Sequence, residues 1–171
     1  MTKNSITYSW FAIYTKPRRE KKAYDRFLQS GIESYLPLVK TLKQWSDRKK
    51  WVEEPLFRSY VFVKVSEREY YDALNANPHT VRYITFEGKA VPIPPVQIEA
   101  MKSYIEQGDF GERDLSGLEP GQKIEVTLGP MRGLRGRLVR IASKQKVRVE
   151  IDGVGKALYL EVPGAMLRIV Q

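Results

Sequence analysis

Apolar and polar residues alternate through the C-terminal third of the sequence, and this pattern constrains the fold more than any other. The alternating apolar positions are Ile124, Val126, Leu128, Leu138, Val139, Ile141, Val147, Val149, Ile151, Leu158, Leu160, Val162, Leu167 and Ile169. A period of two is typical of half-buried strands, and glycine, proline or Lys-Gln interrupts it at short intervals. Five short strands within roughly 50 residues are typical of a small barrel. Residues 121–171 are therefore predicted to form an all-β barrel.

Residues 1–107 combine strand and helix patterns instead. Trp10–Thr15 is dense in aromatic and β-favouring residues, so it is predicted to be a buried strand. Residues 18–30 then carry apolar side chains at helical spacings and end at a glycine. Residues 33–65 are predicted to form a projecting hairpin with a basic tip, and its return ends in Tyr60–Val65, the strongest strand pattern. Helices interspersed with hairpin-connected strands indicate an α+β domain with helices packed on an antiparallel sheet.

A short acidic segment separates the two parts. Residues 108–120 read GDFGERDLSGLEP, which is rich in glycine, serine and aspartate and ends in proline. This composition is typical of a linker, and basic residues outnumber acidic ones on both sides of it. The predicted organisation is an N-terminal domain over 1–107, a linker over 108–120 and a C-terminal domain over 121–171.

The chain is strongly basic, with a net charge of +9 at pH 7 and a pI near 9.7. A basic surface gains affinity for nucleic acids by releasing counterions from phosphate backbones. The sequence has no cysteine and one histidine, which excludes thiolate zinc sites and histidine clusters; no metal or cofactor is expected. It also lacks a long apolar run and the regions of a signal peptide, so we expect a cytoplasmic protein without membrane contact.

The glycine-rich stretch GPMRGLRG, residues 129–136, could be a phosphate loop or a tight β corner. A Walker-type loop requires a lysine and a hydroxyl residue beside the last glycine, but Arg137 and Leu138 stand there. A dinucleotide fingerprint must open a helix, whereas this stretch leads into a strand pattern. The glycines are therefore predicted to shape a barrel corner, with Arg132 and Arg135 free to touch a partner.

The glycine stretch belongs to a longer motif. It comprises Gly121–Val126, Gly129-Pro130, Gly133, Gly136 and the following apolar strand. This motif resembles the KOW motif of NusG-family transcription factors and some ribosomal proteins. In the N-terminal part, Trp10–Thr15, the basic helix and Phe57–Val63 resemble the NusG N-terminal domain. Both modules stand in the family's order, which implies a NusG N-terminal domain followed by an SH3-like KOW barrel.

The hairpin sequence LPLVKTLKQWSDRKKWVEEPLFRSYVFV is similar to that of the UpxY-type antiterminators, specialised NusG paralogs associated with capsular polysaccharide operons of Bacteroides-like bacteria. The family commonly has Pro-Gly where this chain has Arg58-Ser59. A turn with positive φ at Ser59 would cost free energy relative to glycine.

The resemblance implies that the N-terminal domain docks on RNA polymerase through an aromatic patch. Its candidate residues are Tyr14, Tyr60, Phe62 and Phe86. On the strand YVFVKV, Tyr60 and Phe62 share one face and three valines share the other, and the valines are the better core candidates. The alternative is that these aromatic residues are themselves core.

Two basic clusters are candidates for binding non-template DNA or leader RNA. The first is Lys16, Arg18, Arg19 and Lys22. Such a run could track phosphates, but charge runs are often only a solvated helix face. The second is the hairpin tip Arg48, Lys49 and Lys50, which two tryptophans flank. The tryptophans could contact a partner or could pair across the hairpin.

The barrel is predicted to present a basic surface that includes Arg132, Arg135 and Arg137. In the NusG family this domain recruits a termination factor or a ribosomal protein, and KOW modules elsewhere touch RNA. The sequence does not choose among these partners.

The function implied by the resemblance is transcription antitermination or elongation. The factor would bind RNA polymerase, work as a monomer and promote processive transcription of long operons such as capsular polysaccharide loci. An alternative is a KOW-containing RNA- or ribosome-binding protein. An enzyme is not expected, because the single histidine, His79, lacks an evident catalytic partner.

Overall fold

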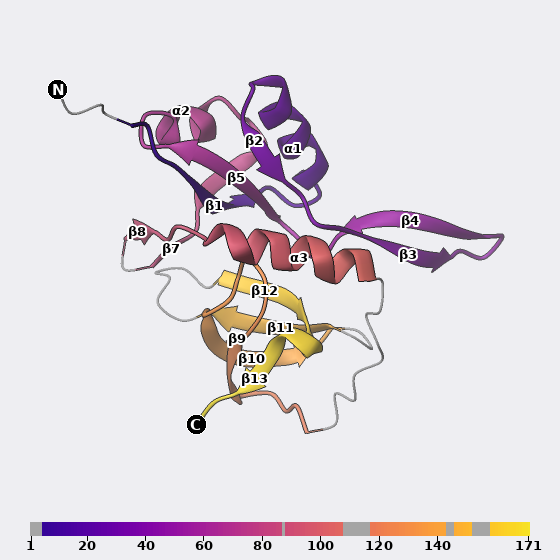
Figure 1. Cartoon of the computed structure of the whole chain (residues 1–171). Coiled ribbons are helices and arrows are strands. Elements are labelled where there is room, and N and C mark those ends of the chain that lie inside the picture. Colours follow the sequence, from indigo (N-terminus) through magenta and orange to yellow (C-terminus); the bar gives the residue numbers. More distant parts are fainter. Residues whose placement is uncertain (1–4, 87, 108–116, 143–145, 152–157) are drawn as a thin grey trace.

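A computed structural model describes residues 5–86, 88–107, 117–142, 146–151 and 158–171 of the chain (Figure 1). Most of the predicted linker, residues 108–120, lies outside the described residues. The division into domains at this segment stays a prediction. The elements before it are called the N-terminal part below, and those after it the C-terminal part.

The N-terminal part is built on a four-stranded antiparallel sheet with the order β2-β5-β1-β6. Its strands are β1 (Tyr8–Thr15), β2 (Glu33–Tyr35), β5 (Tyr60–Ser66) and β6 (Thr80–Tyr83). Helices α1 (Glu20–Gln29) and α2 (Tyr70–Asn75) lie on one face of this sheet (Figure 1). That face is apolar because alternate residues of β1 and β5 point toward the helices, and Val61, Val63 and Val65 pack with Phe27 of α1. The α+β prediction is confirmed for this part.

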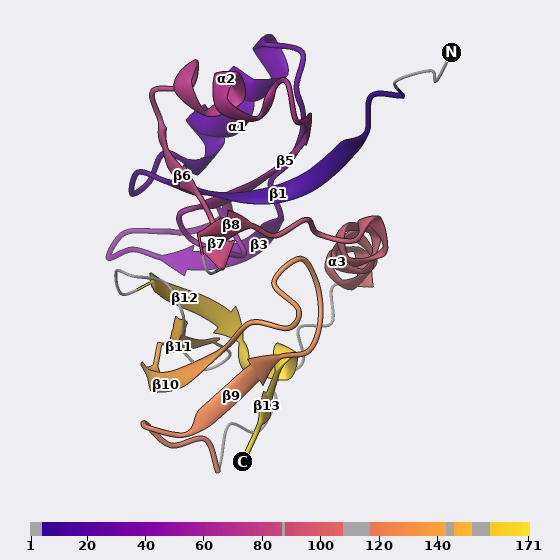
Figure 2. The ribbon, with the colours of Figure 1, turned by 90° about the vertical axis from the view of Figure 1, so that its left-hand side faces the viewer.

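The opposite face of the same sheet is also apolar, and this was not expected. Trp10, Ala12, Tyr60 and Phe62 belong to a second hydrophobic cluster, separate from the cluster under α1 and α2. Helix α3 (Pro95–Gln107) and the C-terminal part lie on this side of the sheet (Figure 2). The central strand β5 is therefore buried on both faces.

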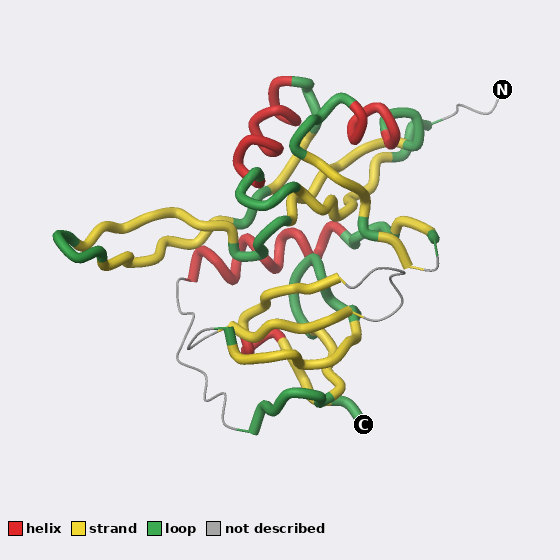
Figure 3. The backbone as a smooth tube through the Cα atoms, turned by 180° about the vertical axis from the view of Figure 1, so that it is seen from behind, coloured by secondary structure: helices red, strands yellow, loops and turns green. Residues whose placement is uncertain are grey.

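A hairpin of β3 (Leu38–Gln44) and β4 (Lys49–Pro55) projects from the N-terminal part, as predicted (Figure 3). It is shorter than the predicted range 33–65, because β2 and β5 pair with each other in the main sheet. A smaller ribbon pairs β7 (Thr85–Phe86) with β8 (Lys89–Ala90). The base of the long hairpin is tied to helix α1, because the Lys21 ammonium donates a hydrogen bond of 2.8 Å to the carbonyl oxygen of Glu53. This bond connects the arm to the helix that carries the first basic cluster.

The C-terminal part is a five-stranded antiparallel sheet with the order β12-β11-β10-β9-β13. Its strands are β9 (Lys123–Val126), β10 (Arg135–Ile141), β11 (Lys146–Ile151), β12 (Leu158–Pro163) and β13 (Leu167–Ile169). A short 3-10 helix, Gly164–Met166, connects the last two strands. The predicted five strands are confirmed, and closure of the sheet into a barrel stays a prediction.

The glycine stretch 129–136 connects β9 to β10 and forms a tight corner, as predicted. Gly129 and Gly133 have φ values of +81° and +91°, in the left-handed region that favours glycine. Gly129 has a second role, because the terminal methyl of Met101 from α3 occupies the space that a Cβ at this position would need. The corner therefore also contacts the N-terminal part.

Ser59, just before β5, has a φ of +66°, so the chain adopts the left-handed turn here although serine stands in place of glycine. Its N–H donates a hydrogen bond of 2.8 Å to the buried carboxylate of Glu20, and its carbonyl accepts one of 2.8 Å from the N–H of Thr15. The left-handed conformation costs a non-glycine residue about 1–2 kcal/mol, so the two hydrogen bonds hold the turn against strain.

Replacing Ser59→Gly is expected to stabilise the protein by up to about 1 kcal/mol, because the relief of strain exceeds the extra entropy of glycine in the unfolded chain. The shift of the urea midpoint measures this effect. Ser34→Gly is the matched control, since Ser34 lies in β2 outside the left-handed region, and this change should destabilise. Equal destabilisation by both changes would contradict the strain at Ser59.

Candidate functional site

The predicted polymerase-docking residues lie mainly on the second apolar face of the N-terminal sheet. Tyr14 and Tyr60 face each other on β1 and β5, with ring centroids 5.7 Å apart in an edge arrangement. Phe62 lies two residues further along β5 and shares this face. The backbone of Phe86 belongs to β7, and its side chain lies outside the described residues. The structure therefore brings Tyr14, Tyr60 and Phe62 together.

The expected exposure of Tyr60 and Phe62 is wrong. Their exposed fractions are 1% and 0%, and Tyr14 is half-buried. Alternation along β5 correctly separated two faces, but both faces are covered: α1 and α2 cover the valines, and the C-terminal part covers the aromatic face. The role of these residues in polymerase binding stays a prediction.

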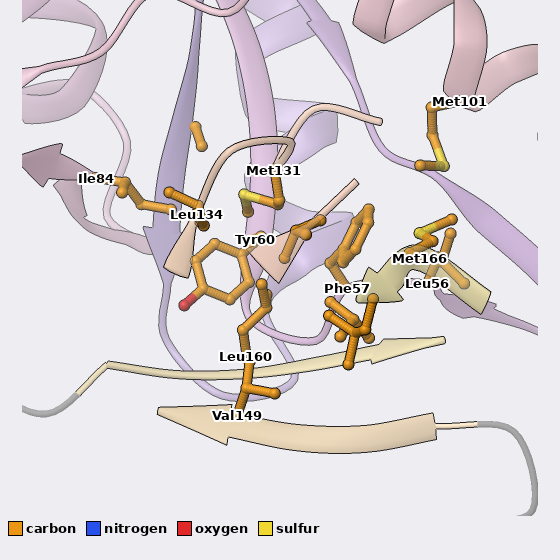
Figure 4. Packing of buried hydrophobic residues seen from close by; sticks show 14 of the residues in the cluster. Leu56, Phe57, Tyr60, Ile84, Met101, Met131, Leu134, Val149, Leu160 and Met166 are labelled. Carbon is orange, nitrogen blue, oxygen red and sulfur yellow. The ribbon is translucent and has the colours of Figure 1, made fainter. Parts of the chain in front are cut away.

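Side chains of the two parts meet in one hydrophobic cluster, part of which Figure 4 shows. The N-terminal part contributes Leu56, Phe57 and Tyr60, and the C-terminal part contributes Leu134, Leu160 and Met166, among others. Burial of an aromatic or aliphatic side chain stabilises by about 1.5–3 kcal/mol. The contact between the two parts is therefore mainly apolar.

An ion pair also crosses this contact. The Arg58 guanidinium lies 3.7 Å from the Glu161 carboxylate of β12, but the arginine side chain is 64% exposed. An exposed ion pair of this kind contributes about 0–1 kcal/mol. Burial and the neighbouring Tyr14 raise the pKa of Tyr60, so its hydroxyl stays neutral across the physiological range.

The first basic cluster lies at the start of α1 and in the loop before it. Lys16, Arg18, Arg19 and Lys22 are all exposed. Arg18 adopts a left-handed φ of +59°, which is uncommon for a residue other than glycine. All four side chains are accessible to a ligand, and nucleic-acid binding by this cluster stays a prediction.

His79 belongs to the same face, and sequence reasoning missed it. Partial burial, then the charges of Arg19, Lys22, Lys16 and Arg26, lower the pKa of this histidine. More than 50 residues separate His79 from these cations, so no local sequence pattern could have revealed their proximity.

The hairpin tip presents Arg48, Lys49 and Lys50 as exposed side chains. The Trp45 N–H donates a hydrogen bond of 2.8 Å to the Arg48 carbonyl, and the Arg48 guanidinium lies 5.7 Å from the centre of the Trp45 ring. Trp51 is opposite Leu42 and is 65% exposed. The two tryptophans therefore do not pair across the hairpin, and Trp51 has a ring face available for contact.

The C-terminal part exposes Arg132, Arg135 and Arg137. Arg135 lies 3.5 Å from Glu125, which Arg168 also contacts at 2.8 Å. The hydrogen bond from Arg168 lowers the pKa of Glu125, although this carboxyl is partly desolvated. Arg137 is directly opposite Lys123 on one neighbouring strand and Glu150 on the other, and its guanidinium donates a hydrogen bond of 3.5 Å to the carbonyl of Gly121. This sheet therefore exposes basic side chains of which some have acidic or carbonyl neighbours.

The structure adds two observations for the residues that it describes. Nowhere among them do three or more His, Asp or Glu side chains gather in a group suited to a metal ion. No helix within the described ranges is both long and apolar enough to cross a membrane.

The candidate sites of this protein are all contact surfaces for other macromolecules. They are an apolar aromatic face, a cationic helix, a projecting hairpin and a small basic sheet. Residues 8–102 match the family model for NusG, described as "Transcription termination factor nusG". The chain therefore belongs to the NusG family. Members of this family are transcription factors of the elongation and antitermination class, not enzymes.

Three solved structures are similar to this chain. One is described as "Domain interaction in Thermotoga maritima NusG": it is 17% identical, with a TM-score of 0.42, and the match covers 96% of this chain and 98% of the other. Two are conformations A and B of the MjSpt4:Spt5 complex, each with a TM-score of 0.31. They are 17% and 18% identical, and the matches cover 95% of this chain and 98% and 97% of theirs.

Proposed function

We propose that this protein is a transcription antitermination factor that binds RNA polymerase and promotes processive transcription of long operons. The observation that carries the proposal is the aromatic face of the N-terminal sheet, where Tyr14, Tyr60 and Phe62 lie together. Aromatic side chains supply large contact area at low entropic cost and dominate the energetics of many interfaces. The protein would act in the cytoplasm as a monomer, through binding energy and without catalytic chemistry.

In this proposal, the structure in which the C-terminal part covers the aromatic face is a closed form of the protein. Polymerase and the C-terminal part compete for the same aromatic face, because Tyr60 and Phe62 cannot contact both at once. The apparent affinity for polymerase is the affinity of the open form reduced by the fraction of molecules that are open. Polymerase binding would therefore separate the two parts and release the C-terminal sheet.

In the open form the N-terminal part would bridge the polymerase cleft and hold its clamp closed, which reduces pausing and termination. The similarity of the hairpin to the UpxY-type paralogs favours capsular polysaccharide loci as the target operons. The released C-terminal part would offer Arg132, Arg135 and Arg137 to a termination factor or a ribosomal protein.

The basic cluster at α1 would bind non-template DNA or leader RNA through its cationic side chains. Arg19→Glu is expected to weaken binding of a single-stranded oligonucleotide. A plot of the logarithm of the association constant against the logarithm of the salt concentration has a negative slope. The variant should reduce the magnitude of this slope by about 0.7 for each phosphate that it no longer neutralises. Binding measured by anisotropy at several salt concentrations gives this slope.

Arg68→Glu is the matched control for this prediction, because it makes the same charge change at an exposed residue outside the cluster. It should leave the slope close to that of the wild-type chain. An equal change in slope for both variants would mean that net charge, and not this cluster, determines binding.

A second candidate function is that of a KOW-containing RNA- or ribosome-binding protein. The exposed side chains of Arg132, Arg135 and Arg137 on the C-terminal part favour it, because arginine side chains bind the phosphates of RNA. Capture by immobilised RNA polymerase distinguishes the two functions: retention supports the antitermination factor, and retention only on ribosomes or RNA supports the alternative.

A further inference from the structure

The turn that follows helix α2 is fixed against helix α1. The Asn77 side-chain amide donates a hydrogen bond of 2.9 Å to the carbonyl of Ala23, and the Arg26 guanidinium donates one of 3.4 Å to the carbonyl of Ala76. The N–H of Lys16 donates a third, of 2.9 Å, to the carbonyl of His79 itself. Asn77 is buried, so this connection is part of the fold. These bonds hold the His79 ring beside the basic cluster at α1.

Four cations from two elements lie near enough to His79 to lower its pKa, and two of them come from residues that hydrogen-bond to the turn at residues 76–79. The loop before α1 provides Lys16 and Arg19, and α1 itself provides Lys22 and Arg26. The nearby acidic residue Glu20 does not balance them, because its carboxylate is buried and accepts the N–H of Ser59. Among the described residues, the ion pairs of the protein involve other side chains.

Such a group of cations without acidic partners repels itself, and a bound anion relieves the repulsion. Partial burial and the four cations already keep the pKa of His79 below its ordinary value. A phosphate placed among the cations would add a negative charge beside the ring and an acceptor for its second N–H. Both effects favour the imidazolium form.

We propose that His79, together with Lys16, Arg19, Lys22 and Arg26, forms a site for a backbone phosphate of a single-stranded nucleic acid, and that His79 takes up a proton when the phosphate binds. The inference rests on the proposed binding of nucleic acid at α1 and adds the histidine to that site. It makes nucleic-acid binding dependent on pH near neutrality, which the lysine and arginine side chains alone would not do.

The direction of the pH dependence follows from the pKa of His79 in the free protein and in the complex with the nucleic acid. The pKa of His79 is low in the free protein and higher in the complex, so the complex carries more protons between these two values. The affinity therefore rises as the pH falls through the pKa of the complex, and it levels off below the pKa of the free protein. We expect a gain in affinity of about threefold to tenfold between pH 8 and pH 5.

His79 is the only histidine of the chain, so its imidazole protons give a single titrating pair of NMR signals. The experiment titrates the full chain from pH 5 to 8 without ligand, with the oligonucleotide dT12 and with the oligonucleotide U12, at low salt. The expected result is a free pKa below the ordinary value and a higher pKa with at least one oligonucleotide. The two oligonucleotides distinguish a DNA from an RNA ligand.

Two variants test the arrangement of the cluster. Arg19→Gln should raise the pKa of His79 in the free protein, whereas Arg68→Gln, outside the cluster, should leave it unchanged. His79→Asn should still bind the oligonucleotide, but with an affinity that no longer changes between pH 5.5 and 8.

The outcomes separate this inference from the proposed function. If the oligonucleotides bind with a salt dependence that Arg19→Glu reduces, but the pKa of His79 does not change, the histidine is not part of the site and the nucleic-acid function stands. If neither oligonucleotide binds, the proposed nucleic-acid surface and the histidine site both fail.

Discussion

A Gly129→Ala variant is expected to bind RNA polymerase more tightly than the wild-type chain. The new methyl group would occupy the space of the Met101 terminal methyl, so this methyl must shift within the buried contact between the two parts. Overpacking of this kind costs about 1–3 kcal/mol. Because the clash exists only in the closed form, the ratio of open to closed molecules should increase about 5- to 150-fold.

A second glycine in the same stretch, Gly133, provides the control for this experiment. Gly133 also has a left-handed φ, of +91°, but no atom lies within contact distance of a Cβ at this position. Gly133→Ala therefore carries the same backbone penalty without the collision with Met101. Polymerase affinity, measured by titration with a labelled core enzyme, should rise for Gly129→Ala and not for Gly133→Ala. Equal affinities for both variants would contradict the closed form.

Replacing Tyr60→Ala should lower the free energy of unfolding by about 3–5 kcal/mol, because the ring is 1% exposed and lies in the cluster that joins the two parts. In the Gly129→Ala background, where the closed form is already weakened, the same change should reduce polymerase binding by about 1–3 kcal/mol if Tyr60 is an anchor of the docking face. In the wild-type background the loss of the ring also weakens the closed form, which acts in the opposite direction. Urea unfolding measures the first effect, and titration of polymerase with folded protein measures the second.

Tyr71→Ala provides the comparison, since Tyr71 is 70% exposed on α2 and lies outside the shared cluster. It should change both quantities by no more than about 0.5 kcal/mol. If Tyr60→Ala lowered the free energy of unfolding in urea by no more than Tyr71→Ala does, the burial of Tyr60 would be wrong. If Tyr60→Ala in the Gly129→Ala background bound polymerase as tightly as Gly129→Ala alone, Tyr60 would not be an anchor.

Local patterns were sufficient to predict the elements of both parts and the division of β5 into two faces. Val61, Val63 and Val65 pack under the helices and Tyr60 and Phe62 point the other way, as the alternation indicates. Alternation does not show what covers a face. Leu134, Leu160 and Met166, which pack in the cluster of Tyr60, are more than 70 residues away in the sequence.

The same limit applies to the candidate sites. The corner at residues 129–136 could be predicted, because it depends on the local backbone. The contact of Gly129 with Met101 and the place of His79 among the α1 cations could not, because both depend on how distant elements pack.

The most direct test of the central claim is transcription in vitro by purified RNA polymerase on a template with a long leader. The proposed function predicts that the wild-type chain increases read-through and reduces pausing on its cognate leader. Gly129→Ala should reach the same effect at a lower concentration. If neither protein changed pausing or read-through at any concentration, on cognate or generic leaders, the proposed antitermination function would be contradicted.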